Sequence, residues 1–586
     1  MDSRIKKHSA LRDGFFIAGT VLLLLFSLWK SRYGLGIYDE SFYLTIPYRM
    51  CHGDKLFLNE WHVSQLSALL QYPLMKLYLL VHPGTDGIVL DFRRIYIAVN
   101  FAAGLLAYRR LKKHGVGAAV AVLLYLLYAP YNIMALSYNS LGLLCGFLCA
   151  VYLAAAAKKF RLYYGRAVLR SDYTIAGLFF AGLVLCQPLM LAEFAVVYPV
   201  LICISLILKR RELLRGLLWF LLGCAILAAP VLVYFIFSVG ISNILAALPL
   251  MMSDPEHDMG ELLSVSFIYR SIVDYYLPEM PAGLRFVSRS TLKVLYMGFV
   301  PICAAACLDR GRCRRAALYL SLSTLLCALI AAAYTLLYPY RSTYISYVNY
   351  LLFPWLLHGV CLMPLLTKSE RWQLSLFYAL GFLHALSFLT SNQGGNVFSV
   401  ALLPACLASI MLSIKYCSSL GRAKAVPVFI CTAVSAALLL YVRAGYCFMS
   451  PPVSQFDTQC ISGPAAGIYA AEDDAARCDS VSLSMNSKSF DADGSTLFLA
   501  TDPLFYLCTD TGLAQYSAWL SFNIDSTPSR LEAYYSLNPD KRPDTIVIEK
   551  AILPELESDA AADWAAEHGF SFEEDDMCFF MRRLPD

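Results

Sequence analysis

Long apolar runs separated by short polar segments dominate the chain up to residue 444. A helix needs about 20 apolar residues to cross about 30 Å of hydrocarbon, because each residue rises 1.5 Å. By that length the pattern predicts about thirteen transmembrane helices, so residues 1–444 are expected to form an α-helical multi-pass membrane domain. The expected spans lie near residues 14–30, 92–108, 116–134, 140–157, 173–188, 190–208, 215–239, 291–308, 316–337, 350–367, 373–390, 397–415 and 426–443.

One further apolar segment, Leu66–Val81, lies between the first two expected spans. It contains Gln71, Pro73 and Lys76, and it is short for a span. We therefore interpret it as an amphipathic helix that lies at the outer interface of the membrane.

Short basic clusters between the spans predict the topology. When the spans alternate in direction, all these clusters fall on one side, which the positive-inside rule makes cytoplasmic. The N-terminus is then cytoplasmic, and no small-residue cleavage site follows the first apolar run, so this run is expected to be a retained anchor. The outer face receives the long first loop 31–91 and everything after residue 443. The clusters begin at Arg4, Arg109, Lys158, Lys209, Asp309 and Gly421.

The composition changes abruptly after Arg443. Residues 445–586 hold 24 Asp and Glu against 8 Lys and Arg, and they contain no run long enough to span a membrane. Short β-branched or apolar runs begin at Ser495, Pro543 and Cys578, and a helical pattern runs from Ser558 to Gly569. The sequence therefore predicts a small extracytoplasmic α/β domain. We expect it to be a recognition or lid domain without chemistry of its own, so that its deletion would leave donor binding measurable. The acidic run from Glu573 is expected to be a solvated face.

Composition and motifs exclude several functions. The chain is 58% apolar and 15% charged, and its basic residues form no continuous stripe, so nucleic acid is not an expected partner. It contains neither a Walker-type phosphate loop nor a strand–GxGxxG–helix pattern for nucleotides. Apart from Glu193, near the outer end of its helix, no charged residue lies deep inside an expected span, which disfavours an ion-coupled transporter.

The candidate chemistry lies on the expected outer face. Asp39 and Glu40 follow the first span, Arg93 and Arg94 open the second, and Arg341 lies in an outer loop. A carboxylate can act as a general base toward a hydroxyl group, and the planar fork of Arg suits a phosphate leaving group. Alternatively, the Arg side chains reach toward lipid headgroups or pair with Asp91.

This arrangement resembles the GT-C superfamily of polyprenyl-phosphate-sugar-dependent glycosyltransferases. The closest parallels are protein O-mannosyltransferases and lipid A aminoarabinose transferases. The shared features are a first span followed by Asp39-Glu40 in a long outer loop, Arg at the outer start of the second span, and an external C-terminal domain. The resemblance implies that Asp39 is the catalytic base, with Glu40 as an orienting partner.

Two further sets of residues are candidates for acceptor or metal contacts. The loop "NEWHVSQ" holds Glu60 and His62, which could contact an acceptor or a metal or simply form hydrogen bonds. The run "SDPEHDMGE" supplies oxygen and imidazole groups of the kind that bind a divalent ion, although a solvated loop is the simpler interpretation. The residues concerned in that run are Asp254, Glu256, His257 and Asp258.

The cysteines of the outer region leave disulfide pairing open. Five of the 19 cysteines lie after residue 444, so one of these five would remain unpaired if they form disulfides with one another. They are Cys447, Cys460, Cys478, Cys508 and Cys578.

Together these patterns and the resemblance predict a membrane glycosyltransferase that inverts the anomeric configuration of the sugar it transfers. The donor would be a polyprenyl-phosphate sugar, carrying a hexose or a pentose, and the acceptor a glycan, lipid or protein of the cell envelope. A divalent metal ion is the one candidate cofactor. Two alternatives stay open: a non-enzymatic flippase or exporter of lipid-linked glycan, which should tolerate Asp39→Asn, and a glycan polymerase or ligase.

Overall fold

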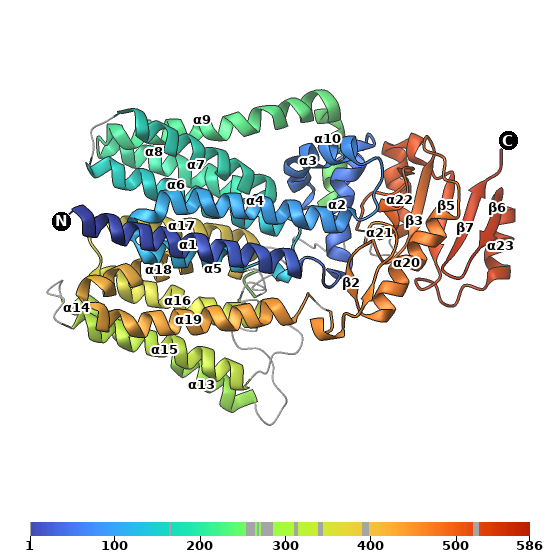
Figure 1. Ribbon diagram of the computed structural model, residues 1–586. Coiled ribbons are helices and arrows are strands. Elements are labelled where there is room, and N and C mark those ends of the chain that lie inside the picture. The colour runs from blue at the N-terminus through green and yellow to red at the C-terminus, as the bar shows by residue number, and fades with distance from the viewer. Residues whose placement is uncertain are drawn as a thin grey trace.

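The computed structural model describes residues 2–162, 166–252, 264–266, 269–270, 285–309, 315–337, 344–389, 398–448, 450–519 and 527–585. A bundle of long helices forms one part, and an α/β domain at the C-terminal end of the chain forms the other (Figure 1). Helices α2 (Ile37–Cys51), α3 (Ala68–Val81) and α10 (Ile241–Met252) lie where the two parts meet. We call the adjoining end of the bundle its domain-facing end.

The remaining helices of the bundle follow most of the expected spans. They are α1 (Asp2–Lys30), α4 (Ile88–Leu111), α5 (Val116–Leu127), α6 (Tyr138–Leu162), α7 (Arg166–Cys186), α8 (Leu189–Ile207), α9 (Arg211–Tyr234), α13 (Arg285–Met297), α14 (Phe299–Leu308), α15 (Ala316–Leu337), α16 (Tyr344–Leu362), α17 (Lys368–Leu389), α18 (Phe398–Leu420) and α19 (Arg422–Gly445).

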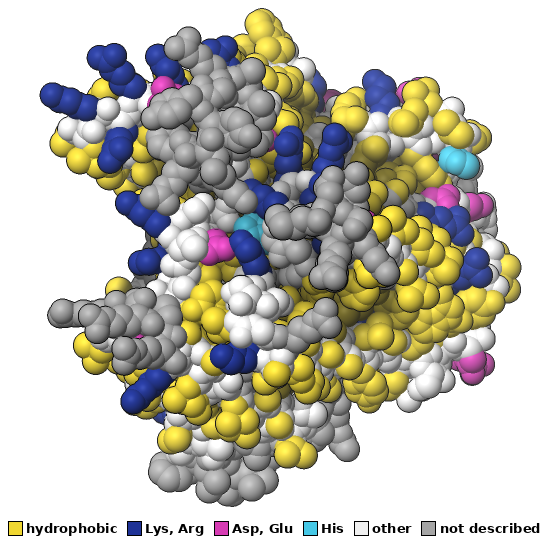
Figure 2. All heavy atoms as spheres, turned by 60° about the vertical axis from the view of Figure 1, so that its left-hand side comes forward, with side chains coloured by type: hydrophobic (Ala, Val, Ile, Leu, Met, Phe, Trp, Pro, Cys, Tyr) yellow, Lys and Arg dark blue, Asp and Glu magenta, His cyan; other side chains and the backbone are white. Residues whose placement is uncertain are grey.

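Eight helical segments among the described residues are long and apolar enough to cross a membrane. Their surfaces support that role, because large apolar side chains such as Val196 and Ile207 of α8 are 67% and 77% exposed. Figure 2 shows apolar side chains over wide areas of one face of the molecule. The count of thirteen spans is not confirmed.

Helices α5 and α3 are too short to cross a membrane. The expected span 116–134 is helical in α5 only from Val116 to Leu127, because the chain becomes extended at Tyr128 and Pro130 follows. A helix of 12 residues extends about 18 Å, less than the hydrocarbon thickness. Helix α3 has 14 residues and is likewise too short to cross, in agreement with its interpretation as an interfacial helix.

The C-terminal domain begins where α19 ends, at Gly445. Its main sheet has the strand order β4-β3-β5-β7-β6, in which β3 pairs in parallel with β4 and β5, and β7 pairs antiparallel with β5 and β6. The strands are β1 (Thr458–Gln459), β2 (Tyr469–Ala470), β3 (Ser495–Leu499), β4 (Gly512–Leu513), β5 (Thr545–Glu549), β6 (Phe570–Glu574) and β7 (Cys578–Arg583). The helices are α20 (Glu472–Asn486), α21 (Leu504–Leu507), α22 (Thr527–Leu537) and α23 (Ser558–Glu567).

Strands β3, β5 and β7 and helix α23 confirm the elements expected in this domain. Strand β6 was not expected, because Glu573 and Glu574 suggested a solvated acidic run. These residues pair with Phe580 and Phe579 on the exposed edge of the sheet. The five cysteines of this region are free thiols in the structure.

The C-terminal domain is joined closely to the loop that follows α1. Residues Arg32 and Gly34 exchange backbone hydrogen bonds with Tyr469, and the Trp61 amide donates to the Tyr516 carbonyl at 2.7 Å. Lys541 of the domain forms an ion pair with Asp54 at 2.7 Å. The loop and the domain therefore form one packed unit.

Candidate functional site

Helix α2 directs the two adjacent acidic residues to different neighbours. It begins after Gly36 and carries Asp39 and Glu40 in its first turn, where carboxylates interact favourably with the free N–H groups of the helix. Successive helical residues diverge by about 100°. Glu40 accordingly meets Arg93 of α4, whereas Asp39 meets Tyr43 one turn further along α2.

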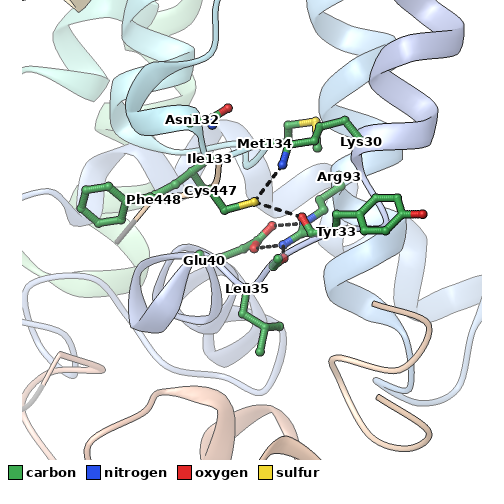
Figure 3. A pocket seen from close by; sticks show the side chains of 12 residues that line it. Lys30, Tyr33, Leu35, Glu40, Arg93, Asn132, Ile133, Met134, Cys447 and Phe448 are labelled. Atoms are coloured by element: carbon green, nitrogen blue, oxygen red, sulfur yellow. Dashed lines mark hydrogen bonds and ion pairs between the residues drawn. The ribbon is translucent and has the colours of Figure 1, made fainter. Parts of the chain in front are cut away.

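Glu40 and Arg93 form a buried ion pair (Figure 3). Arg93 donates from Nε and Nη2 to the two carboxylate oxygens of Glu40 at 2.6 and 2.5 Å. Its Nη1 and Nη2 also donate to the carbonyl oxygens of Ser31 and Gly34 at 2.7 and 2.6 Å. Both side chains are only 4% exposed. The guanidinium fork of Arg93 is engaged by Glu40 in this structure, and its contact with a donor phosphate stays a prediction.

Two cations that the sequence analysis did not select lie beside this pair. Lys30, the last residue of α1, is fully buried, and among the described residues its Nζ donates to the Cys447 sulfur at 2.9 Å. Arg443, in the last turn of α19, is 3% exposed and donates to the side-chain oxygen of Asn132. Both stand at the expected outer ends of spans, against the positive-inside tendency. The same signal selected Arg93, and it could have found them.

The backbone beside Lys30, Arg93 and Cys447 adopts conformations that let these side chains approach closely. Gly34 has φ +78°, and a Cβ atom at this position would lie 2.3 Å from the Cys447 sulfur, so the position requires glycine. Tyr131 and Asn132 have φ values of 55° and 58°, a left-handed conformation that is uncommon outside glycine. The Asn132 side chain faces the small cavity that Lys30 and Arg93 also line.

Asp39 is partly buried next to two tyrosines. Its Oδ1 accepts a hydrogen bond from the Tyr43 hydroxyl at 3.1 Å, and the ring of Tyr138 packs edge-on against Tyr43. Burial raises the pKa of Asp39 to about 6; the Tyr43 hydrogen bond lowers it, and the nearby negative charge of Glu40 raises it. A carboxylate with such a pKa is ionised at neutral pH and still basic enough to accept a proton.

Arg94 and Arg341 are the other residues expected to contact the donor phosphate. Arg94 pairs with Asp91 at 2.7 Å and is 49% exposed, which is the alternative that the sequence left open. Arg341 lies outside the described residues, as do Asp254, Glu256, His257 and Asp258. Metal binding by the latter four stays a prediction. No group of three or more His, Cys, Asp or Glu residues in the described ranges could hold a metal ion.

Glu60 and His62 have neighbours within the protein. Glu60 is 2% exposed, pairs with Arg49 at 2.8 Å, and accepts from the backbone amide of Ala518 at 2.9 Å. His62 Nδ1 lies 2.8 Å from the Ser64 hydroxyl, and its ring packs edge-on against Phe42. In this structure Glu60 is engaged by Arg49 and by backbone amides, as the hydrogen-bonding alternative expected, and a contact of Glu60 or His62 with an acceptor or a metal stays a prediction.

Comparisons with known proteins complete the description. No family model and no curated protein matches the chain. Among solved structures, it is similar to the archaeal oligosaccharyltransferase AglB from Archaeoglobus fulgidus, in complex with an inhibitory peptide and a dolichol-phosphate. That match has 12% identity and a TM-score of 0.42, and it covers 92% of this chain and 70% of AglB.

The chain is also similar to ArnT from Cupriavidus metallidurans. The apo structure matches with 13% identity and a TM-score of 0.36, covering 98% of each chain. The structure bound to undecaprenyl phosphate matches with 14% identity and a TM-score of 0.35, covering 98% of this chain and 99% of ArnT.

Proposed function

We propose that this chain is a membrane glycosyltransferase that uses Asp39 as a general base. The donor is a polyprenyl-phosphate sugar, and transfer takes place at the domain-facing end of the bundle, on the outer face of the membrane. The observation that carries the proposal is a partly buried carboxylate, with its pKa raised to about 6, at the end of an apolar helix bundle. A lipid-linked donor would present its phosphate and sugar at this end of the bundle, where the apolar helices leave the membrane.

The proposed step is a single displacement. Asp39 takes the proton of an acceptor hydroxyl, whose oxygen attacks the anomeric carbon of the donor. The bond between that carbon and the phosphate oxygen breaks, and the polyprenyl phosphate leaves as an anion. One attack from the opposite side inverts the anomeric configuration.

Buried basic groups beside Glu40 favour such a leaving group. Arg93 and Arg443 are buried guanidinium cations, Lys30 is a buried amine next to the Cys447 thiol, and Glu40 is the one carboxylate bonded directly to any of these three side chains among the described residues. The net positive charge of this group stabilises the departing phosphate anion without direct contact, because electrostatic interactions are strong where water is excluded. Arg94, whose partner Asp91 is accessible, can exchange that partner for a phosphate at the rim.

The test is turnover in proteoliposomes with a synthetic polyprenyl-phosphate sugar and mass spectrometry of the products. Asp39→Asn keeps the size of the side chain but accepts no proton, so turnover should fall by about 10²–10⁴-fold while donor binding persists. The matched control is Asp457→Asn, an exposed carboxylate of the C-terminal domain, which should behave like wild type. Normal turnover by Asp39→Asn would refute Asp39 as the base, whereas donor binding without any transfer by the wild type would favour a flippase or exporter.

A further inference from the structure

The C-terminal domain holds the first turn of α2 from the side opposite Arg93. The Ser41 hydroxyl donates to Asp502 Oδ1 at 2.8 Å, and both residues are buried. The same Oδ1 accepts from the backbone amide of Leu504 at 2.8 Å, which fixes the carboxylate at the start of α21. Ser41 is therefore bonded to a rigid point of the domain.

Arg477 of α20 strengthens this contact. Its Nη1 lies 3.4 Å from Asp502 Oδ2, and its Nη2 lies 2.7 Å from Glu549 Oε1 at the end of β5. Its guanidinium group lies over the ring of Tyr38, 5.7 Å from the ring centre, at a distance typical of a cation–π interaction. Arg477 thus connects the central sheet of the domain with the first turn of α2.

Helical geometry explains what these contacts do to Asp39. Residues three or four apart share a face of a helix, so Tyr38 and Ser41 lie together and face the C-terminal domain. Asp39 and Tyr43 form a second such pair, and Glu40 points to Arg93. Arg93 therefore holds this turn through Glu40, and the C-terminal domain holds it through Tyr38 and Ser41. Asp39 lies on a different side of the helix.

We propose that Asp502, held in place by Arg477, is a positioning residue that orients Asp39 through its hydrogen bond to Ser41 in the first turn of α2. This inference rests on the proposed function, in which Asp39 is the base. A misplacement of about 1 Å can cost about a hundredfold in rate, so loosening this turn should slow the proton transfer without touching the donor. The C-terminal domain then takes part in the reaction in addition to any role in binding an acceptor.

The experiment compares two hydrogen bonds between α2 and the same domain. Ser41→Ala removes the bond to Asp502 next to Asp39. Tyr48→Phe removes a bond of similar length, 2.7 Å to Asp510, near the other end of the helix, and is the matched control. Ser41→Thr keeps a hydroxyl group and tests for rescue.

Three readouts are measured: kcat and KM for transfer, the acid limb of the pH–rate profile, and hydrogen–deuterium exchange of residues 41–45. Ser41→Ala should lower kcat about tenfold or more with little change in donor KM, and exchange at 41–45 should rise. The acid limb should move to lower pH, because Asp39 gains water while Tyr43, Tyr138 and Glu40 remain the groups around it. Tyr48→Phe should leave the pH profile and this exchange unchanged.

The outcomes separate the two proposals. If Ser41→Ala behaves like Tyr48→Phe in all three readouts, the positioning role is refuted. If exchange at 41–45 rises in Ser41→Ala while Asp39→Asn retains full turnover, the contact holds the turn but Asp39 is not the base, and the proposed function fails instead.

Discussion

The ion pair between Glu40 and Arg93 allows a quantitative test of how the site is held. Replacing Glu40 by Gln preserves the shape of the side chain but leaves the Arg93 cation, only 4% exposed, without a counter-charge. Removing one partner of a buried pair costs about 3–5 kcal/mol of folding free energy. Two charge-assisted hydrogen bonds, at 2.6 and 2.5 Å, join this pair, so we expect a value in that range for Glu40→Gln and for Arg93→Gln.

The assay is equilibrium unfolding of the purified protein in mixed micelles, arranged as a double-mutant cycle. The variant with both replacements should lose less than the sum of the single losses, because neither charge is then left unpaired; a coupling of about 2 kcal/mol is expected. The neighbouring pair of Arg94 with Asp91 is the control. It is exposed, so Asp91→Asn should cost less than about 1 kcal/mol.

The result that would refute this reasoning is equally specific. If Glu40→Gln and Arg93→Gln both unfold within about 0.5 kcal/mol of wild type, the pair is neither buried nor bonded as the structure has it. Arg93 would then again be free to contact a donor phosphate.

Other predictions follow from the same contacts. The pKa of Asp39 is raised to about 6, so transfer should fall about tenfold per pH unit below that value as the base becomes protonated. The stability from protonated Asp39 is fully present below its ordinary pKa near 4 and is lost as pH rises through about 6, measurable as the pH dependence of unfolding. Deleting 445–586 removes partners of Ser41 and Glu60, so donor binding should be lost together with transfer; a truncated protein that binds donor normally would contradict this. Lys30→Met should raise the donor KM at least tenfold if the buried cations favour the phosphate, and an unchanged KM would count against that role.

The deletion prediction revises what the sequence suggested about the C-terminal domain. From composition alone it was expected to be a recognition or lid domain without a part in the chemistry, so that its removal would leave donor binding measurable. The structure shows that buried polar groups of the first loop, among them Ser41 and Glu60, each form a hydrogen bond with this domain. An unpaired buried polar group costs stability, so the two parts are not independent.

The sequence determined the features that depend on neighbours along the chain. Apolar runs of sufficient length predicted most of the helices, because a helix satisfies its own backbone hydrogen bonds, and alternating apolar runs predicted β3, β5 and β7. The position of Asp39 directly after the first span was also visible in the sequence. So was the divergence of Asp39 from Glu40, which follows from the turn angle of a helix.

The tertiary structure alone decided which charges meet. Arg93 lies 53 residues from Glu40 in the sequence, and Asp502 lies 461 residues from Ser41, and no local pattern relates such distant positions. From the sequence we expected Arg93 to contact a donor phosphate and Glu60 to contact an acceptor or a metal or to form hydrogen bonds, and we gave no role to Lys30. The structure pairs Arg93 with Glu40 and Glu60 with Arg49, since a charge removed from water needs a partner in whichever segment packs against it.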